Sequence, residues 1–126
     1  MSETHQLVVV GAGAAGLWAA ARAAELGVND VVVLEKTSRS GTKILASGGT
    51  HCNVTTTLPS EEAARLFGDK GARFLRTAFR ELPPLALRER FHDLGVPTVD
   101  APLEKVFPAS GKAKDVRDAL ERWAIE

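Results

Sequence analysis

Three glycines near the N-terminus have the spacing of a loop that binds a dinucleotide. They lie in Gly11-Ala12-Gly13-Ala14-Ala15-Gly16, directly after the β-branched run at residues 7–10. In such a loop the first glycine permits a tight turn, and the second lets the backbone approach a pyrophosphate. The third lets the following helix pack closely on the strand. Because free N–H groups at a helix N-terminus attract phosphates, residues 11–16 are predicted to hold a pyrophosphate.

An acidic residue stands where such a loop requires one. Glu35 follows the apolar run at residues 31–34, about 20 residues after the last glycine, which is the usual separation. A carboxylate there accepts hydrogen bonds from the ribose hydroxyls of an adenosine. It also repels a 2′-phosphate, so the site is expected to disfavour NADP.

A long polar segment then follows, with a short apolar stretch at residues 44–46. Its glycines leave room for a ligand, and several of its side chains can donate hydrogen bonds to phosphate or ribityl oxygens. The glycines are Gly41, Gly48 and Gly49, and the donors are Arg39, Lys43, Ser47 and Thr50. Structureless loops of this length in compact domains usually have a function. The alternative is a flexible surface loop.

These residues require a strand, a helix and a second strand to position them. The sequence predicts strands at residues 7–10 and 31–34, parallel and adjacent, joined by a helix over residues 14–26 that Gly27 ends. The fold class is therefore α/β, with a Rossmann-like βαβ unit for FAD or NAD(P). Trp18 falls on a helix face away from the sheet, where we expect it to be exposed unless a segment outside this chain covers it.

Composition limits the class of protein. The chain has 126 residues, of which 44% are hydrophobic and 25% charged, with zero formal net charge and one cysteine. These values are typical of a soluble domain. They give no indication of a nucleic-acid or membrane partner, and a cytoplasmic location is expected. His5, His51, His92 and Cys52 lack the spacing of metal ligands, so no metal is expected.

The remaining sequence predicts mostly helices. We expect helices at residues 60–67, at 71–81 and after Pro83-Pro84, short strands at residues 96–99 and 105–107, and a last helix after Ser110. The expected division is residues 1–58, the βαβ unit and cofactor loop, and residues 59–126, the helical segment. Because the last apolar helical pattern has no stop signal before Glu126, an incomplete domain that continues in a missing C-terminal part is expected.

Several motifs together resemble the BaiN-type flavoproteins, which are NAD(P)/FAD-dependent oxidoreductases with a glutathione-reductase-like FAD domain. The resemblance rests on residues 11–17, on Leu34-Glu35-Lys36 and on the run Gly41-Thr-Lys-Ile-Leu-Ala-Ser-Gly-Gly-Thr-His-Cys-Asn53-Val-Thr. It continues to about residue 123. The usual pattern there is close to GRKILISGGGRCNxTN. This chain departs from it at Thr42, at Thr50-His51 and at Thr56 or Thr57.

The resemblance implies FAD as the cofactor, NAD(P)H as a candidate electron donor, and a role near the cofactor for Lys36, Cys52 and Asn53. The family's members are about three times longer, so this chain matches their N-terminal part. The substrate and the catalytic residues are not identified by the sequence. Cys52 could be a redox thiol or a small residue packed near the cofactor, and His51 a proton donor or a solvated loop residue.

Two other functions remain open. A dehydrogenase that uses NAD alone would fit the glycine loop, although the chain has no tyrosine for a Tyr-x-x-x-Lys pair. A truncated remnant without catalytic activity would fit the abrupt C-terminal end. If the chain is part of a flavin-dependent oxidoreductase, the isolated 126 residues are expected to be inactive.

Overall fold

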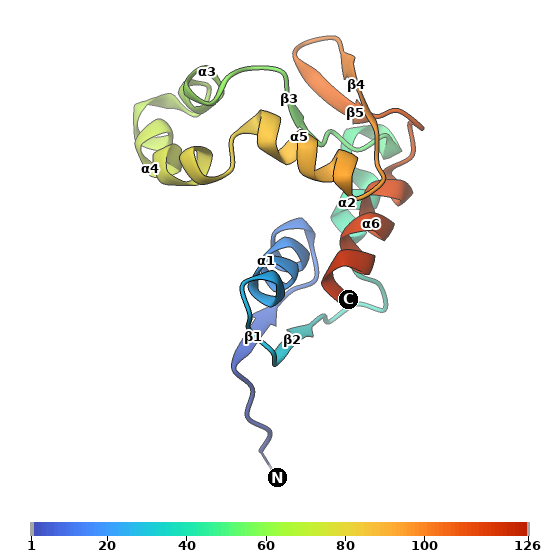
Figure 1. Cartoon of the computed structure of the whole chain (residues 1–126). Helices are drawn as coiled ribbons and strands as arrows, with labels where there is room; N and C mark the ends of the chain where they lie inside the picture. The colour runs from blue at the N-terminus through green and yellow to red at the C-terminus, as the bar shows by residue number, and fades with distance from the viewer. Residues whose placement is uncertain (1, 126) are drawn as a thin grey trace. The chain divides into compact units, whose positions relative to one another are not determined.

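The computed structural model describes residues 2–125. Its elements, in chain order (Figure 1), are β1 (Leu7–Val10), α1 (Ala14–Glu25), β2 (Val31–Leu34), α2 (Thr42–Ala46), the 3-10 helix η1 (Ser47–Thr50), β3 (Thr55–Thr56), α3 (Ser60–Arg65), α4 (Gly68–Glu81), α5 (Pro84–Asp93), β4 (Thr98–Ala101), β5 (Lys105–Pro108) and α6 (Ala113–Ile125). Within residues 2–125, no helix is both long and apolar enough to cross a bilayer.

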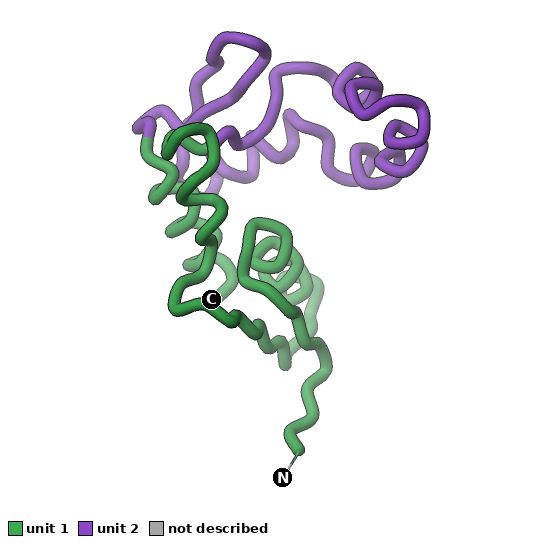
Figure 2. Tube along the Cα trace, turned by 180° about the vertical axis from the view of Figure 1, so that it is seen from behind, with its two compact units in different colours: residues 1–52, 112–126 green, residues 53–111 purple. Residues whose placement is uncertain are grey.

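The elements form two compact units, which Figure 2 distinguishes by colour. One contains residues 1–52 and 112–126, and the other contains residues 53–111. This division differs from the one expected at residue 58, because α6 returns to pack on α1 and α2. An amphipathic helix far along the chain therefore completes the first unit.

The first unit contains the predicted βαβ arrangement. β1 and β2 pair in parallel, with Leu7 opposite Val31 and Val10 opposite Leu34. Each strand is a short apolar run with three valines, and β-branched side chains favour extended backbone. The helix between them begins at Ala14, so the predicted strands, their parallel pairing and the connecting helix are confirmed.

Helix α6 covers one face of α1. The buried residues of α1 are Leu17, Ala20 and Ala21, and small side chains let two helices approach closely. The buried residues of α6 are Ala113, Val116, Ala119 and Leu120.

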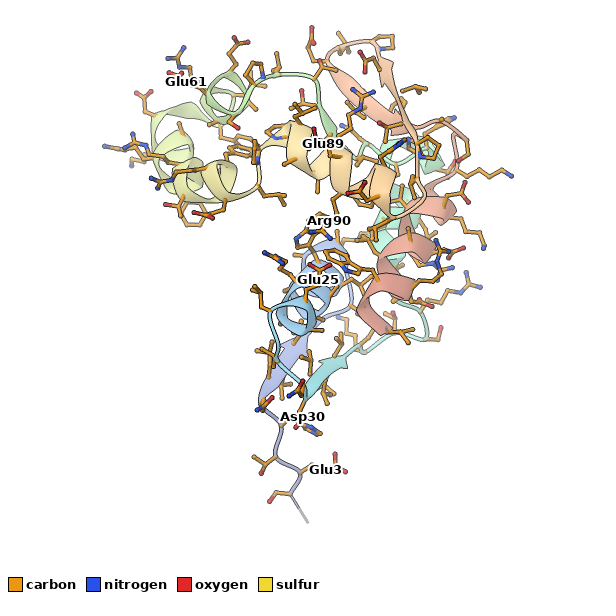
Figure 3. The ribbon with its side chains drawn as sticks, viewed as in Figure 1. Glu3, Glu25, Asp30, Glu61, Glu89 and Arg90 are labelled. Carbon is orange, nitrogen blue, oxygen red and sulfur yellow. The ribbon has the colours of Figure 1, made fainter. Side chains whose placement is uncertain are left out.

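Trp18 is half-buried rather than exposed, so the expectation for this residue was wrong. Its ring contacts that of Trp123 edge to face, with 5.0 Å between centroids. The indole Nε1 of Trp123 donates a hydrogen bond of 2.8 Å to Glu25 on α1 (Figure 3). A segment of this same chain therefore covers Trp18.

The second unit combines helices with a small antiparallel sheet in the order β3-β5-β4. The expected strands near residues 96–99 and 105–107 pair as a hairpin, whereas the two-residue strand β3 was not anticipated. Val106 has no exposed surface, and Phe91 and Val96 are each 4% exposed. α3 and α4 pack on each other within this unit.

Candidate functional site

The glycine loop connects β1 to α1 through a turn that a side chain would strain. Gly11 has φ of 101°, in the region that favours glycine. Its N–H donates to the carbonyl of Leu34 at 2.7 Å, which ties the end of β1 to the end of β2. Gly13 then occupies the N-cap position of α1, and Leu17 N–H makes a helical bond to its carbonyl at 2.9 Å.

Gly16 allows α1 to lie against the loop and the strand. A Cβ atom added there would be 1.9 Å from the carbonyl oxygen of Gly11 and 3.3 Å from Cγ1 of Val9. The first distance is far below any contact that real atoms make, and a backbone carbonyl cannot turn aside. Only glycine fits this position without displacing the helix.

Gly13 differs because the space beside it is open. A Cβ atom at this position would meet no atom within 4 Å. No side chain caps α1, so the N–H groups of its first turn have no capping partner. These groups and the positive end of the helix dipole leave a place where a phosphate could approach the backbone.

Glu35 is held beside this loop by hydrogen bonds to both carboxylate oxygens. Its Oε1 accepts from the N–H of Ala12 at 2.9 Å. Its Oε2 accepts from the N–H and the hydroxyl of Thr37, each at 2.8 Å. These donors, the Ala12 N–H foremost, lower the pKa of Glu35 from 4.5 to about 2. Because a carboxylate has about four acceptor positions, Oε1 can still accept a ribose hydroxyl.

The polar segment after Glu35 is not the structureless loop that the sequence predicted. It contains α2 and η1, because the apolar stretch provides Ile44, which is 6% exposed. The N–H of Gly41 donates to the carbonyl of Ala12 at 2.6 Å, so the segment is attached directly to the glycine loop. A Cβ atom on Gly41 would lie 2.5 Å from Cγ of Arg117. The space beside Gly41 is thus filled by α6 and does not receive a ligand.

Four predicted cofactor-binding residues of this segment differ in how exposed they are and in their hydrogen bonds. The Ser47 hydroxyl donates to the carbonyl of Ile44 at 2.9 Å, so its own hydrogen is used within the protein. Lys43 is exposed on α2. Gly48 and Gly49 are exposed, with φ of 56° and 63° inside η1.

The remaining predicted residues are Lys36, Cys52 and Asn53. Lys36 is exposed, and so is Asn53, which belongs to the second unit. Cys52 is 5% exposed and its N–H donates to the carbonyl of Ser47 at 3.0 Å. Burial raises the pKa of the Cys52 thiol, so it remains protonated near neutral pH and is a poor nucleophile.

Sequence reasoning missed the residues that support the site. Thr37 fixes one oxygen of Glu35, and the Ser40 hydroxyl donates to Glu121 on α6. Thr37 lies only two positions after Glu35, so a local bond between them is sterically possible, but the sequence alone does not specify it. The hydrogen bond between Ser40 and Glu121 joins residues 81 positions apart, so no local sequence pattern could predict it.

A protein-family model matches this chain along nearly its whole length, whereas a curated relative matches less than half of it. Residues 5–126 match the family model described as the HI0933-like protein Rossmann domain. A curated relative, the ribosomal RNA dihydrouridine synthase of Haemophilus influenzae, is 47% identical over 55 residues. That match covers 44% of this chain and 14% of the relative. The glycine loop, the parallel strands and the family match agree, and the chain belongs to the HI0933-like Rossmann-domain family, the BaiN-type group of flavin-dependent oxidoreductases.

Proposed function

We propose that this chain forms the FAD-binding region of a flavin-dependent oxidoreductase. The observation that carries the proposal is the convergence of an open Gly13, an uncapped α1 N-terminus and an ionised Glu35 on one loop. These three groups match the pyrophosphate and the adenosine ribose of a dinucleotide. Family membership favours FAD over NAD as that dinucleotide.

Each group would bind a different part of the cofactor. The N–H groups at the start of α1 would hold the pyrophosphate, and Glu35 would accept hydrogen bonds from the ribose hydroxyls. Lys36, Lys43, Ser47, Gly48 and Gly49, together with Cys52 and Asn53, are proposed to surround the rest of the cofactor. When bound, the flavin supplies hydride or electron transfer, and the protein supplies binding, orientation and electrostatics. NAD(P)H is the proposed electron donor of the complete protein.

A narrower version concerns the substrate. The similar protein from Haemophilus influenzae is named for making dihydrouridine in ribosomal RNA. Forming dihydrouridine adds a hydride and a proton across one carbon–carbon double bond of uridine, which is chemistry that a reduced flavin can perform. We propose the same reaction class for the complete protein that contains this chain.

The test is the flavin content of the complete gene product. We expect about one FAD per chain in the wild type, and loss of FAD in Gly13→Val, because a branched side chain would enter the space needed by the pyrophosphate. Ala19→Val is the matched control, because Ala19 is exposed on the same helix but outside the loop. It should retain its flavin.

The released cofactor, identified by chromatography after denaturation, decides between the alternatives. A folded Gly13→Val variant that keeps all of its FAD would contradict the proposed site. NAD in place of FAD would support the dehydrogenase alternative. A wild type that binds neither cofactor would support a remnant.

A further inference from the structure

The second unit contains a cleft between α3 and α4 that the dinucleotide site does not use. Its volume is about 840 Å³. α3 provides Ser60, Glu61, Ala64 and Arg65, and α4 provides most of the other wall. Figure 3 shows Glu61 on α3, one of the two helices that form the cleft. Ala64 is 8% exposed and Phe79 is half-buried, so the floor of the cleft is apolar.

The charges of this cleft are predominantly positive. Four arginines line it, against the carboxylates of Glu61 and Asp69. The Glu61 carboxylate already has a partner. It forms an ion pair of 2.6 Å with Arg65, one helical turn further along α3. The other three arginines all lie on α4, and Asp69 is the only lining carboxylate on that helix. The zero net charge of the whole chain therefore conceals a local excess of positive charge.

Two of these arginines have no protein partner. Among residues 2–125, Arg73 and Arg76 form no hydrogen bond or ion pair, and both are exposed. Arg80 makes one long bond of 3.4 Å to the hydroxyl of Thr77. Guanidinium groups bind phosphate through two parallel N–H donors, and free ones require no exchange of partner when a phosphate arrives.

The spacing of the α4 arginines favours an extended polyanion over a single phosphate. Arg73, Arg76 and Arg80 follow an i, i+3, i+7 pattern, which places them along one helix face. At about 1.5 Å per residue the row is about 10 Å long. Because phosphates recur at short, regular intervals along a nucleic-acid strand, a row of this length can meet more than one of them.

We propose that this cleft binds the phosphate backbone of a structured RNA. The inference rests on the proposed function, since the similar protein named above acts on ribosomal RNA. The arginines of α4 contact successive phosphates and hold the RNA in position without reading its sequence. The site lies in the second unit and uses none of the residues assigned to the dinucleotide.

The experiment measures the binding of a fluorescein-labelled RNA stem–loop to the complete gene product by fluorescence anisotropy, over a series of KCl concentrations. The test variant is Arg73→Gln/Arg76→Gln. The matched control is Lys105→Gln, which removes an exposed positive charge from outside both the cleft and α4. Flavin content is recorded for all three proteins.

We expect the test variant to bind RNA roughly ten-fold or more weakly than the wild type. The slope of log affinity against log salt should decrease by about 1.4–1.8, because two phosphate contacts are removed and each contributes about 0.7–0.9. The control should change the slope by less than half as much, and flavin content should be equal in all three.

An unchanged slope in the test variant overturns the proposal. The proposal is also overturned if the test variant loses affinity for NADPH while its salt dependence of RNA binding stays unchanged, since the cleft would then bind the phosphate of a small nucleotide. A wild type without flavin would contradict the proposed function alone, because the RNA slope is measured independently of the flavin.

Discussion

Glu35 is kept ionised mainly by hydrogen-bond donors, and the neighbouring cation Lys36 makes a smaller contribution. Its pKa is near 2 in the folded chain, against an ordinary value of 4.5, and the N–H of Ala12 is the largest cause. A lowered pKa means that the ionised form stabilises the folded state at pH above about 4.5. This contribution is lost as the pH falls toward 2.

We therefore expect Glu35→Gln to be less stable than the wild type near neutral pH, and equally stable near pH 2. Urea unfolding of the complete gene product over this pH range measures the difference. A stability difference that stays constant down to pH 2 would show that the hydrogen bonds to Ala12 and Thr37 do not depend on charge. Affinity for FAD at neutral pH should also fall by roughly ten-fold or more in Glu35→Ala, as expected for a lost charged hydrogen bond.

Thr50 has a backbone conformation that its side chain disfavours. Its φ is 77°, and the related pattern has glycine at this position. A left-handed conformation costs an L-residue about 1–2 kcal/mol, whereas glycine loses about 0.5–1 kcal/mol more backbone entropy on folding. Because the backbone strain of threonine exceeds the extra entropy cost of glycine, glycine should make the folded state more stable at position 50.

Thr50→Gly is thus expected to raise the urea midpoint slightly, by a change equivalent to about 0.5–1 kcal/mol. Thr42→Gly is the matched control, since Thr42 is equally exposed but begins the helix α2. That variant should be less stable, because glycine is a poor helix former. If Thr50→Gly is also destabilised, the threonine must make a contact that outweighs its strain.

At the scale of elements, two glycines of one loop have separable effects. A Cβ atom at Gly16 would collide with the carbonyl oxygen of Gly11. A Cβ atom at Gly13 would enter open space, and the φ of −86° at Gly13 is one that any residue adopts. Gly16→Ala should therefore displace α1 from β1 and destabilise the fold by about 1–3 kcal/mol, the usual range for overpacking.

Gly13→Ala should leave the melting temperature nearly unchanged while it lowers the affinity for FAD. Thermal unfolding of both variants, monitored by circular dichroism, separates the two effects. Equal destabilisation would mean that Gly13 also has a packing role, and a stable Gly16→Ala would mean that α1 lies farther from the loop than the structure indicates.

The elements differ in how well the sequence predicts them. β1 and β2 are predictable because each is an uninterrupted apolar run rich in valine, and the glycine pattern between them specifies the connection. The short helix α2 was missed because its five residues lie among glycines that indicate a loop. The two residues of β3 are too few to give a period.

Tertiary packing explains the other errors. Trp18 was predicted to be exposed because its partner, Trp123, lies more than a hundred positions along the chain. The division of the chain into units was missed for the same reason, since only the folded structure shows that α6 packs on α1. Within the candidate site, residue types and spacing predict a role for the glycine loop and Glu35, which stays a prediction, whereas the contacts of Thr37 and Ser40 are seen only in the structure.

At the scale of the whole molecule, the first unit leaves apolar surface on its sheet uncovered. β1 and β2 form a two-stranded sheet, so each strand has one edge without a neighbouring strand within residues 2–125. Val10 is 84% exposed, Leu34 53% and Val8 46%. Parallel sheets are normally covered on both faces, so we propose that further chain would cover these side chains in a longer protein.

We therefore expect residues 1–126 alone to bind FAD weakly or not at all and to show no reductase activity. The glycine loop and Glu35 could still hold the ADP half of the cofactor, but a domain with only about 5–10 kcal/mol of stability has little margin for uncovered strands. The measurement is the visible absorbance of the desalted chain, compared with the flavin released after denaturation at known protein concentration. The complete gene product, purified in the same way, is the control. If residues 1–126 retain nearly one flavin per chain, then the βαβ unit, its polar segment and α6 are sufficient for the cofactor, and the uncovered strands cost less than we infer.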